Sequence, residues 1–157
     1  MSDEIKNIFI SHVHEDDAGL GKLKELCKKN GLEVRDYSIN ADKPNKAKSE
    51  DYIKSEILAP QIDACSALVV YITPMTKDSK YVEWEIDYAA KNDKRIIGVW
   101  AYGETGCEVP KGLEDCADAI VGWNGGQIVA GITGAYDGYE MPDGKQVDRR
   151  QIRRHPC

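Results

Sequence analysis

Residues 67–74, ALVVYITP, constrain the fold most, because six apolar residues stand in a row and several are β-branched. The run is much shorter than the ~18 residues that a membrane-spanning helix requires. It is typical of a strand that is buried on both faces, as in a parallel sheet covered by helices on either side. Four other segments, residues 7–11, 32–38, 95–101 and 119–123, are predicted as further strands.

Helical patterns separate most of these strands. The helix after the first strand is predicted to end at Asn30-Gly31, and Ser79 is a candidate cap for a helix over residues 79–92. A loop is expected between the last two strands. This alternation predicts a doubly wound, flavodoxin-like α/β fold with a five-stranded, mainly parallel sheet flanked by helices. Trp100 ends the fourth strand, where packing is its favoured role.

Ligand sites in doubly wound folds lie at the carboxyl ends of the strands. In this chain those ends are predicted at residues 11–17, 36–38, 73–80 and 100–104. The candidate site residues are therefore sought along this edge of the sheet.

Composition excludes several classes of function. The net charge of -6 argues against a general nucleic-acid binder, which needs surplus Lys and Arg for phosphate contacts. The five cysteines are odd in number and contain no Cys-x-x-Cys, so they favour free thiols in a reducing, cytoplasmic setting. The polar start MSDEIKN predicts no secretory signal, and no apolar run predicts a membrane span.

The chain from about Gly134 has a different character. We expect residues 1–134 to form one domain and residues 135–157 a C-terminal appendage with a possible hairpin at Asp143-Gly144 and a basic tail with four Arg. Two interpretations of the tail stay open: a small surface appendage, or a segment whose arginines assist self-assembly or bind an anion.

The segment FISHVHEDD, residues 9–17, resembles the start of a metal-hydrolase site, because His12, His14 and two aspartates follow a strand. Such a site needs more ligands, and the chain has three His in all, the third in the tail. We therefore predict no metal site. Asp16 or Asp17 is expected instead to cap the helix that follows.

The helix SKYVEWEIDYAAKN, residues 79–92, carries one carboxylate among aromatic rings. At about 100° per residue, an aliphatic stripe should pack on the sheet and a ring stripe should lie beside it, with Glu85 between them. Glu83 and Asp87 are expected to face solvent. The two stripes are Val82, Ile86 and Ala89, and Tyr81, Trp84 and Tyr88.

Two interpretations of this helix stay open from its pattern alone. In the first, the rings cover the margin of the core and Glu85 is a surface acid. In the second, Glu85 is a carboxylate at the ligand-binding edge of the sheet, partly enclosed by the rings. Such a wall raises the pKa of a carboxylate and strengthens its field on a nearby cation.

Taken together, FISHVHEDD, the polar loop after the second strand, SKYVEWEIDYA and KRIIGVWA resemble TIR-like domains, closest to the group used in bacterial Thoeris antiphage systems. The resemblance covers about residues 6–125, and SKYVEWEI is its most specific segment. It implies that Glu85 is the catalytic glutamate. Tyr81 stands where the family often has Trp.

The resemblance implies cleavage of the nicotinamide–ribose bond of NAD+, with an ADP-ribose-derived and cyclic product as a signal in antiphage defence. NAD+ is then a substrate and no cofactor is expected, in keeping with the absence of G-x-G-x-x-G after the first strand. The bond breaks through an oxocarbenium-like state that one carboxylate stabilises. The implied partners are further TIR copies and a downstream effector that senses the product.

The same resemblance implies a set of substrate-binding residues along the predicted edge. These are Ser11, His12, Asp36, Tyr37 and Tyr81. The loop over residues 41–49 would shape the pocket, and its three lysines, Lys43, Lys46 and Lys48, either attract phosphates or are simply solvated.

Three other functions are weighed against the enzyme. A non-enzymatic TIR scaffold usually lacks the glutamate that this chain has at position 85. A phosphoacceptor receiver needs an Asp at the end of the third strand, where this chain reads ITP. An enzyme similar to nucleoside deoxyribosyltransferases would use Glu85 as a covalent nucleophile.

Overall fold

The computed structural model describes residues 4–13, 17–36, 58–103 and 109–147 of the chain. Its centre is one sheet in the order β2-β1-β3-β4-β5-β6-β7. The first five of these strands are parallel, which confirms the predicted doubly wound fold and its flavodoxin-like order. Their bounds are β1 (Glu4–Ser11), β2 (Leu32–Asp36), β3 (Ala67–Ile72), β4 (Arg95–Trp100) and β5 (Ala119–Val121).

The predicted count of five strands is wrong, because two short strands extend the sheet beyond β5. β6 (Tyr139–Glu140) pairs with β5 in parallel, and β7 (Gln146–Val147) pairs with β6 antiparallel. The turn between them contains Asp143, whose carboxylate accepts a 2.8 Å hydrogen bond from the Lys145 amide, and Gly144 at φ +87°. The division of the chain at residue 134 stays a prediction.

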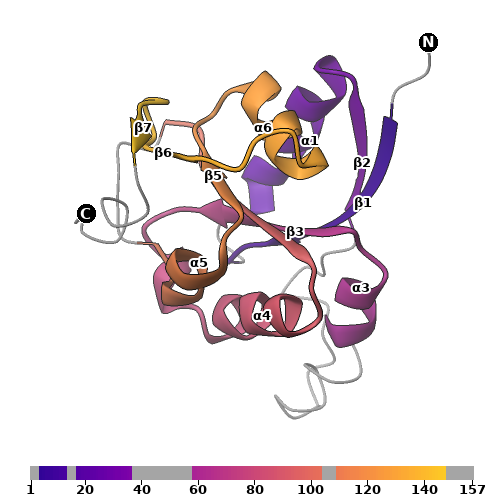
Figure 1. The fold of residues 1–157 in the computed structure, drawn as a ribbon, viewed down its shortest axis with the longest axis vertical. Coiled ribbons are helices and arrows are strands. Elements are labelled where there is room, and N and C mark those ends of the chain that lie inside the picture. Colours follow the sequence, from indigo (N-terminus) through magenta and orange to yellow (C-terminus); the bar gives the residue numbers. More distant parts are fainter. Residues whose placement is uncertain (1–3, 14–16, 37–57, 104–108, 148–157) are drawn as a thin grey trace.

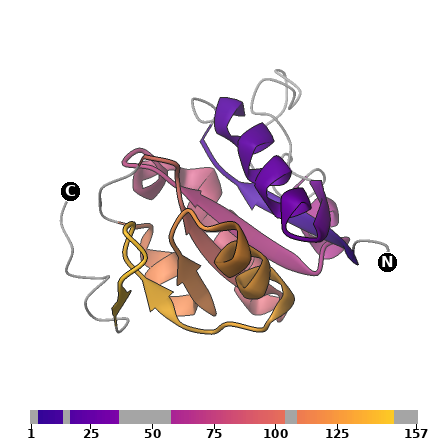
Figure 2. The same ribbon diagram turned by 90° about the horizontal axis from the view of Figure 1, so that it is seen from above.

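Helices cover both faces of the sheet (Figures 1 and 2). α1 (Asp17–Lys29) and α6 (Gly125–Thr133) lie on one face, whereas α3 (Ala59–Asp63), α4 (Lys80–Lys91) and α5 (Lys111–Cys116) lie on the other. A short 3-10 turn, η3 (Thr76–Asp78), joins β3 to α4. The loop predicted between β4 and β5 therefore contains a helix. No helix within the described ranges is long and apolar enough to cross a bilayer.

Two of the predicted helix ends are confirmed. Ser79 caps α4, since its hydroxyl accepts a 3.2 Å hydrogen bond from the Val82 amide. α1 ends before Gly31, whose φ of +87° is a conformation that glycine adopts without steric cost. The predicted cap of α1 lies outside the described residues, because neither Asp16 nor the side chain of Asp17 is described.

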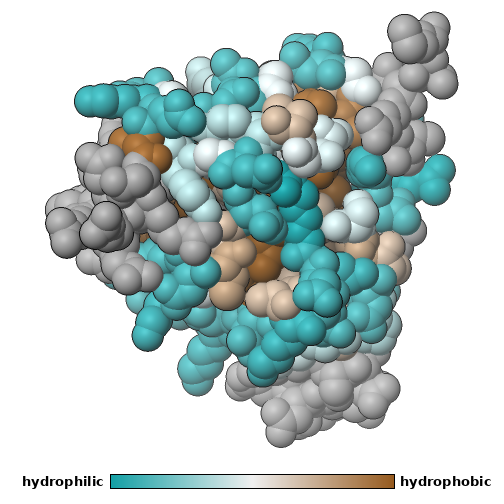
Figure 3. Space-filling view, viewed as in Figure 1, coloured by the Kyte–Doolittle hydropathy of each residue, from teal (hydrophilic) through white to brown (hydrophobic). Residues whose placement is uncertain are grey.

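The strands divide the core into two clusters by the alternation of their side chains. Phe9, Leu68 and Val70 face α4, whereas Ile8, Ile10 and Val69 face α1 and α6. All six residues of β3 are buried, which confirms the inference from its apolar run. Each fully buried Val, Leu or Ile side chain contributes about 1.5–3 kcal/mol through removal from water. In Figure 3, the face seen is mainly hydrophilic, and hydrophobic residues reach it only in small patches.

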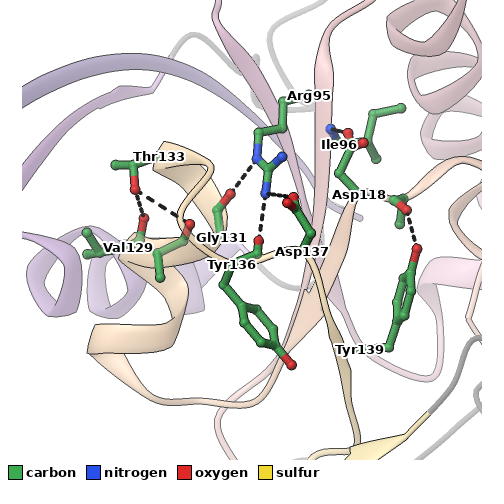
Figure 4. Close-up of polar contacts among 11 residues, drawn as sticks. Arg95, Ile96, Asp118, Val129, Gly131, Thr133, Tyr136, Asp137 and Tyr139 are labelled. Carbon is green, nitrogen blue, oxygen red and sulfur yellow. Dashed lines mark hydrogen bonds and ion pairs between the residues drawn. The ribbon is translucent and has the colours of Figure 1, made fainter.

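β4 is fixed at both ends by segments that follow β5. At its start, the Arg95 guanidinium donates to the carbonyls of Gly131 (2.6 Å) and Tyr136 (2.7 Å) and pairs with Asp137 at 2.8 Å (Figure 4). At its end, Trp100 is fully buried, as predicted for packing, and its Nε1 donates a 2.7 Å hydrogen bond to the carbonyl of Glu140. Residues 136–140 are thereby held on the sheet.

Candidate functional site

Glu85 lies on the buried side of α4, with 6% of its surface exposed. The stripe of Val82, Ile86 and Ala89 packs on the sheet as predicted, and each of these side chains is fully buried. Glu85 follows Val82 by three positions, so it lies at the flank of that stripe. The interpretation of Glu85 as a surface acid is therefore wrong.

The partner of Glu85 is Ser11, the last residue of β1. The Ser11 hydroxyl donates a 2.5 Å hydrogen bond to Glu85 Oε1, and Ser11 is itself 1% exposed. Because Ser11 ends a parallel strand, the pair lies at the carboxyl edge of the sheet, where ligand sites of this fold class occur. The structure therefore brings together two of the residues that the sequence nominated separately.

Burial changes the proton affinity of Glu85. Desolvation raises the pKa of its carboxyl from 4.5 to about 8, and the hydrogen bond from Ser11 acts in the opposite direction. A carboxyl with this pKa retains its proton over most of the neutral range. A nearby cation, such as a positively charged ligand ring, would favour the ionised form.

The aromatic residues of α4 lie in two different environments. Trp84 and Tyr88 stack with ring centroids 5.1 Å apart and pack at the margin of the core. The Tyr88 hydroxyl donates to both carboxylate oxygens of Asp63 on α3, at 2.9 and 3.0 Å, so packing is the role of these two rings. Tyr81, in the first turn of α4, is exposed at 36% and stands one turn before Glu85.

The two other acids of this helix have different environments. Asp87 is exposed as predicted and pairs with Lys91 at 2.9 Å. The prediction that Glu83 faces solvent is wrong: its side chain is half-buried, and Oε1 accepts a long, 3.4 Å hydrogen bond from the Gly112 amide of α5. The helix α5, absent from the prediction, covers this side of α4.

His12 follows Ser11 and is half-buried. Its Nδ1 lies 2.8 Å from the carbonyl oxygen of Ile10, so Nδ1 carries the proton in this contact. This bond orients the imidazole beside the end of β1. Whether His12 binds substrate stays a prediction.

The remaining predicted binding residues are only partly described. Asp36 ends β2, and its backbone is paired in register with Ile8 of β1, but its side chain is not described. Tyr37 and the loop over residues 41–49, with Lys43, Lys46 and Lys48, lie outside the described residues, as does His14. The described ranges contain no group of three or more His, Cys, Asp or Glu that could hold a metal ion.

A second buried acid, Glu140, was missed by the sequence interpretation. It is 6% exposed, and its carboxylate accepts from the Gly122 amide at 3.0 Å and from Gln127 Nε2 at 2.7 Å. One carboxylate oxygen thus joins β6 to the residue after β5, and the other joins it to the first turn of α6. A single acid in a polar tail gives no local signal of such contacts.

Similarity to known proteins is found among solved structures and among family models. Among solved structures, the chain is similar to the TIR domains in the structure of the activated Roq1 resistosome directly recognizing the pathogen effector XopQ, with 19% identity and a TM-score of 0.41. That match covers 60% of this chain and 57% of the other. No curated protein is significantly similar to the chain.

The family model of the Thoeris protein ThsB, TIR-like domain, matches residues 9–105, which is more than half of the chain. The matched range includes the Ser11–Glu85 pair and all of α4. It bears out the resemblance that the sequence motifs indicated. The chain belongs to the TIR-like domain family of the Thoeris protein ThsB.

Proposed function

We propose that this Thoeris TIR-like protein cleaves the nicotinamide–ribose bond of NAD+ and releases an ADP-ribose-derived, cyclic product as a signal in antiphage defence. The observation that carries the proposal is the buried Glu85 carboxyl at the carboxyl edge of the sheet, held by Ser11 at 2.5 Å. Membership of the ThsB family supports the setting in defence.

The proposed chemistry needs one carboxylate and no metal. As the bond to nicotinamide lengthens, positive charge develops on the ribose, and the Glu85 carboxylate stabilises it in a site with little water. Nicotinamide takes the bonding electron pair and leaves as a neutral molecule, so no general acid is required. If an atom of the same ADP-ribose is held near the ribosyl carbon, it replaces water and closes the ring.

A carboxyl that is protonated in the free protein is compatible with this chemistry, because the substrate carries a cationic nicotinamide ring. With the pKa of Glu85 at about 8, the free protein holds the carboxyl largely neutral at pH 7. Arrival of the cation lowers that pKa, the carboxyl releases its proton to solvent, and the resulting carboxylate lies where the charge of the ribose develops.

Other parts of the proposal concern binding and assembly. Ser11, His12, Asp36, Tyr37 and Tyr81 are proposed to border the NAD+ site. Self-association with other TIR copies, a downstream effector that senses the product, and a cytoplasmic location complete the proposed setting.

The test compares Glu85→Gln with Glu83→Gln, the same chemical change two positions away on the same helix. Each variant, with its fold checked by circular dichroism, is incubated with NAD+, and nicotinamide and nucleotide products are measured by mass spectrometry. We expect no product from Glu85→Gln and the wild-type product from Glu83→Gln. Wild-type turnover by a folded Glu85→Gln protein would refute the proposal.

Two further outcomes would favour the alternative functions. A protein that assembles but never consumes NAD+ under activating conditions would be a TIR scaffold. A glycosyl group trapped covalently on Glu85 would indicate chemistry of the nucleoside deoxyribosyltransferase kind, in which the carboxylate attacks the ribose.

A further inference from the structure

We propose that Ser11 is a positioning residue, whose hydroxyl holds Oε1 of Glu85 and leaves Oε2 as the oxygen that acts on the ribose. This inference rests on the proposed function. It replaces the direct contact with substrate that the family resemblance implied for Ser11, because the one proton of the hydroxyl is donated to Glu85.

The two residues are well placed to fix one another, since each belongs to a rigid element. Ser11 is in register with Val70 of β3, so its Cα position is set by the centre of the sheet. Glu85 is fixed by the packing of α4 on that sheet and by the cap at Ser79. A bond between such elements restricts the carboxyl to one orientation before any ligand arrives.

The hydroxyl is also the stabilising influence on the charged form of Glu85. Burial raises the pKa of that carboxyl, and the bond from Ser11 is the influence that lowers it. Elements that pack against α4 carry further titratable groups, but none of those described contributes to this shift. They include Asp63 on α3, Lys77 and Asp78 on η3, Glu114 and Asp115 on α5, and His12 after β1.

A positioning role and a substrate-binding role predict different kinetics. Loss of a substrate contact weakens binding and raises KM. Loss of the Ser11 hydroxyl leaves the substrate contacts in place but misorients Glu85 and makes its ionisation harder, so kcat falls with little change in KM. The pH at which activity is half-maximal also moves upward.

The test uses Ser11→Ala, with Ser66→Ala as the matched control. Ser66 donates to the Asn7 carbonyl at 3.2 Å at the opposite edge of the sheet, away from Glu85. We expect Ser11→Ala to lower kcat about 10- to 100-fold, as for loss of a hydrogen bond to a charged group. Ser66→Ala should retain wild-type kinetics, and Ser11→Thr, which keeps the hydroxyl, should recover most of kcat.

A second measurement needs no turnover. In protein labelled with ¹³C at the glutamate carboxyl, the Glu85 resonance is identified by its absence in Glu85→Gln and titrated by NMR. The midpoint should be higher in Ser11→Ala than in wild type. If Ser11→Ala does not fold, Ser11→Cys, with a weaker donor of similar size, should show the same upward movement.

The outcomes separate this inference from the proposed function. An unchanged Glu85 midpoint in Ser11→Ala, or a raised KM with unchanged kcat, would overturn the positioning role while leaving NAD+ cleavage intact. If the wild-type protein never cleaves NAD+, the proposed function fails, and the NMR titration still decides whether Ser11 controls the protonation of Glu85.

Discussion

The indole of Trp100 and the backbone of Glu140 are joined by a hydrogen bond of 2.7 Å between the indole Nε1 and the carbonyl oxygen, in the interior of the protein. Trp100 ends β4 and Glu140 ends β6, so the bond links two strands that are separated in the sheet by β5. It ties the segment that follows α6 to the central core.

Trp100→Phe is therefore expected to destabilise the fold. The substitution removes the indole N–H and leaves the buried Glu140 carbonyl without a hydrogen-bond donor. It also opens a small cavity where the larger ring stood. We predict a loss of about 1–3 kcal/mol in the free energy of unfolding, measured by urea denaturation. Tyr102→Phe, at a ring that is 68% exposed, is the control and should change stability little.

Glu140→Gln is predicted to destabilise the protein although it is nearly isosteric. Both oxygens of Glu140 accept hydrogen bonds, from Gly122 and from Gln127. An amide offers one oxygen, which can accept from only one of these donors. Gln127 can rotate its own amide and accept from the new NH₂ group, so two bonds to a carboxylate are replaced by two weaker neutral bonds, at a cost of about 1 kcal/mol. Gln127→Ala in the same background should relieve part of this cost, and purely additive effects of the two changes would contradict the arrangement.

The buried carboxyl of Glu85 should also make stability depend on pH. The pKa of Glu85 is about 8 in the folded protein, and its ordinary value of 4.5 applies to the unfolded chain. Between pH 4.5 and 8, the native state therefore holds a proton that the unfolded chain has released. The stabilising contribution of this proton to the free energy of unfolding is fully present below pH 4.5. It is lost as pH rises toward 8, at up to about 1.4 kcal/mol per pH unit.

Denaturation of wild type and Glu85→Gln at pH 5, 6, 7 and 8 measures this contribution. The variant lacks the titrating group, so its stability should fall less steeply and exceed that of wild type most at pH 8. Parallel curves for the two proteins over this range would show that Glu85 titrates normally in the native state.

Much of the sheet could be predicted because its signals are local. The apolar run of β3 and the cap at Ser79 each lie within a few residues of the element that they define.

The helices α5 and α6 were not predicted, and the reason is again local. α5 is short and contains Gly112, and α6 begins with Gly125 and Gly126, which lower helix propensity. The Asn124 side chain, which accepts from the Gln127 amide at 3.1 Å, is the cap signal that could have located α6.

The position of Gly98 illustrates why packing could not be anticipated. A Cβ at this residue would lie 2.9 Å from a methyl group of Leu113, so the glycine of β4 admits the close approach of α5. Because α5 was not predicted, the half-buried position of Glu83 could not be predicted either.

The sequence predicted the two residues of the candidate site one by one, but it could not predict their contact. Glu85 was found from its place in a family motif, and Ser11 from its place at the end of a strand. Their hydrogen bond joins residues 74 positions apart, and no local pattern reports such a distance. Burial of Glu85 follows from the packing of α4 on the sheet, and its raised pKa follows from that burial.

The most direct test of the central claim is the pH dependence of nicotinamide release from NAD+ by the wild-type protein, followed as kcat/KM from pH 6 to pH 9. This quantity reports the ionisation of the free enzyme. With Glu85 as the catalytic carboxylate, kcat/KM should rise about tenfold per pH unit and level off near pH 8, where its pKa lies. A rate that is flat across this range, or the same profile in a folded Glu85→Gln protein, would contradict the account.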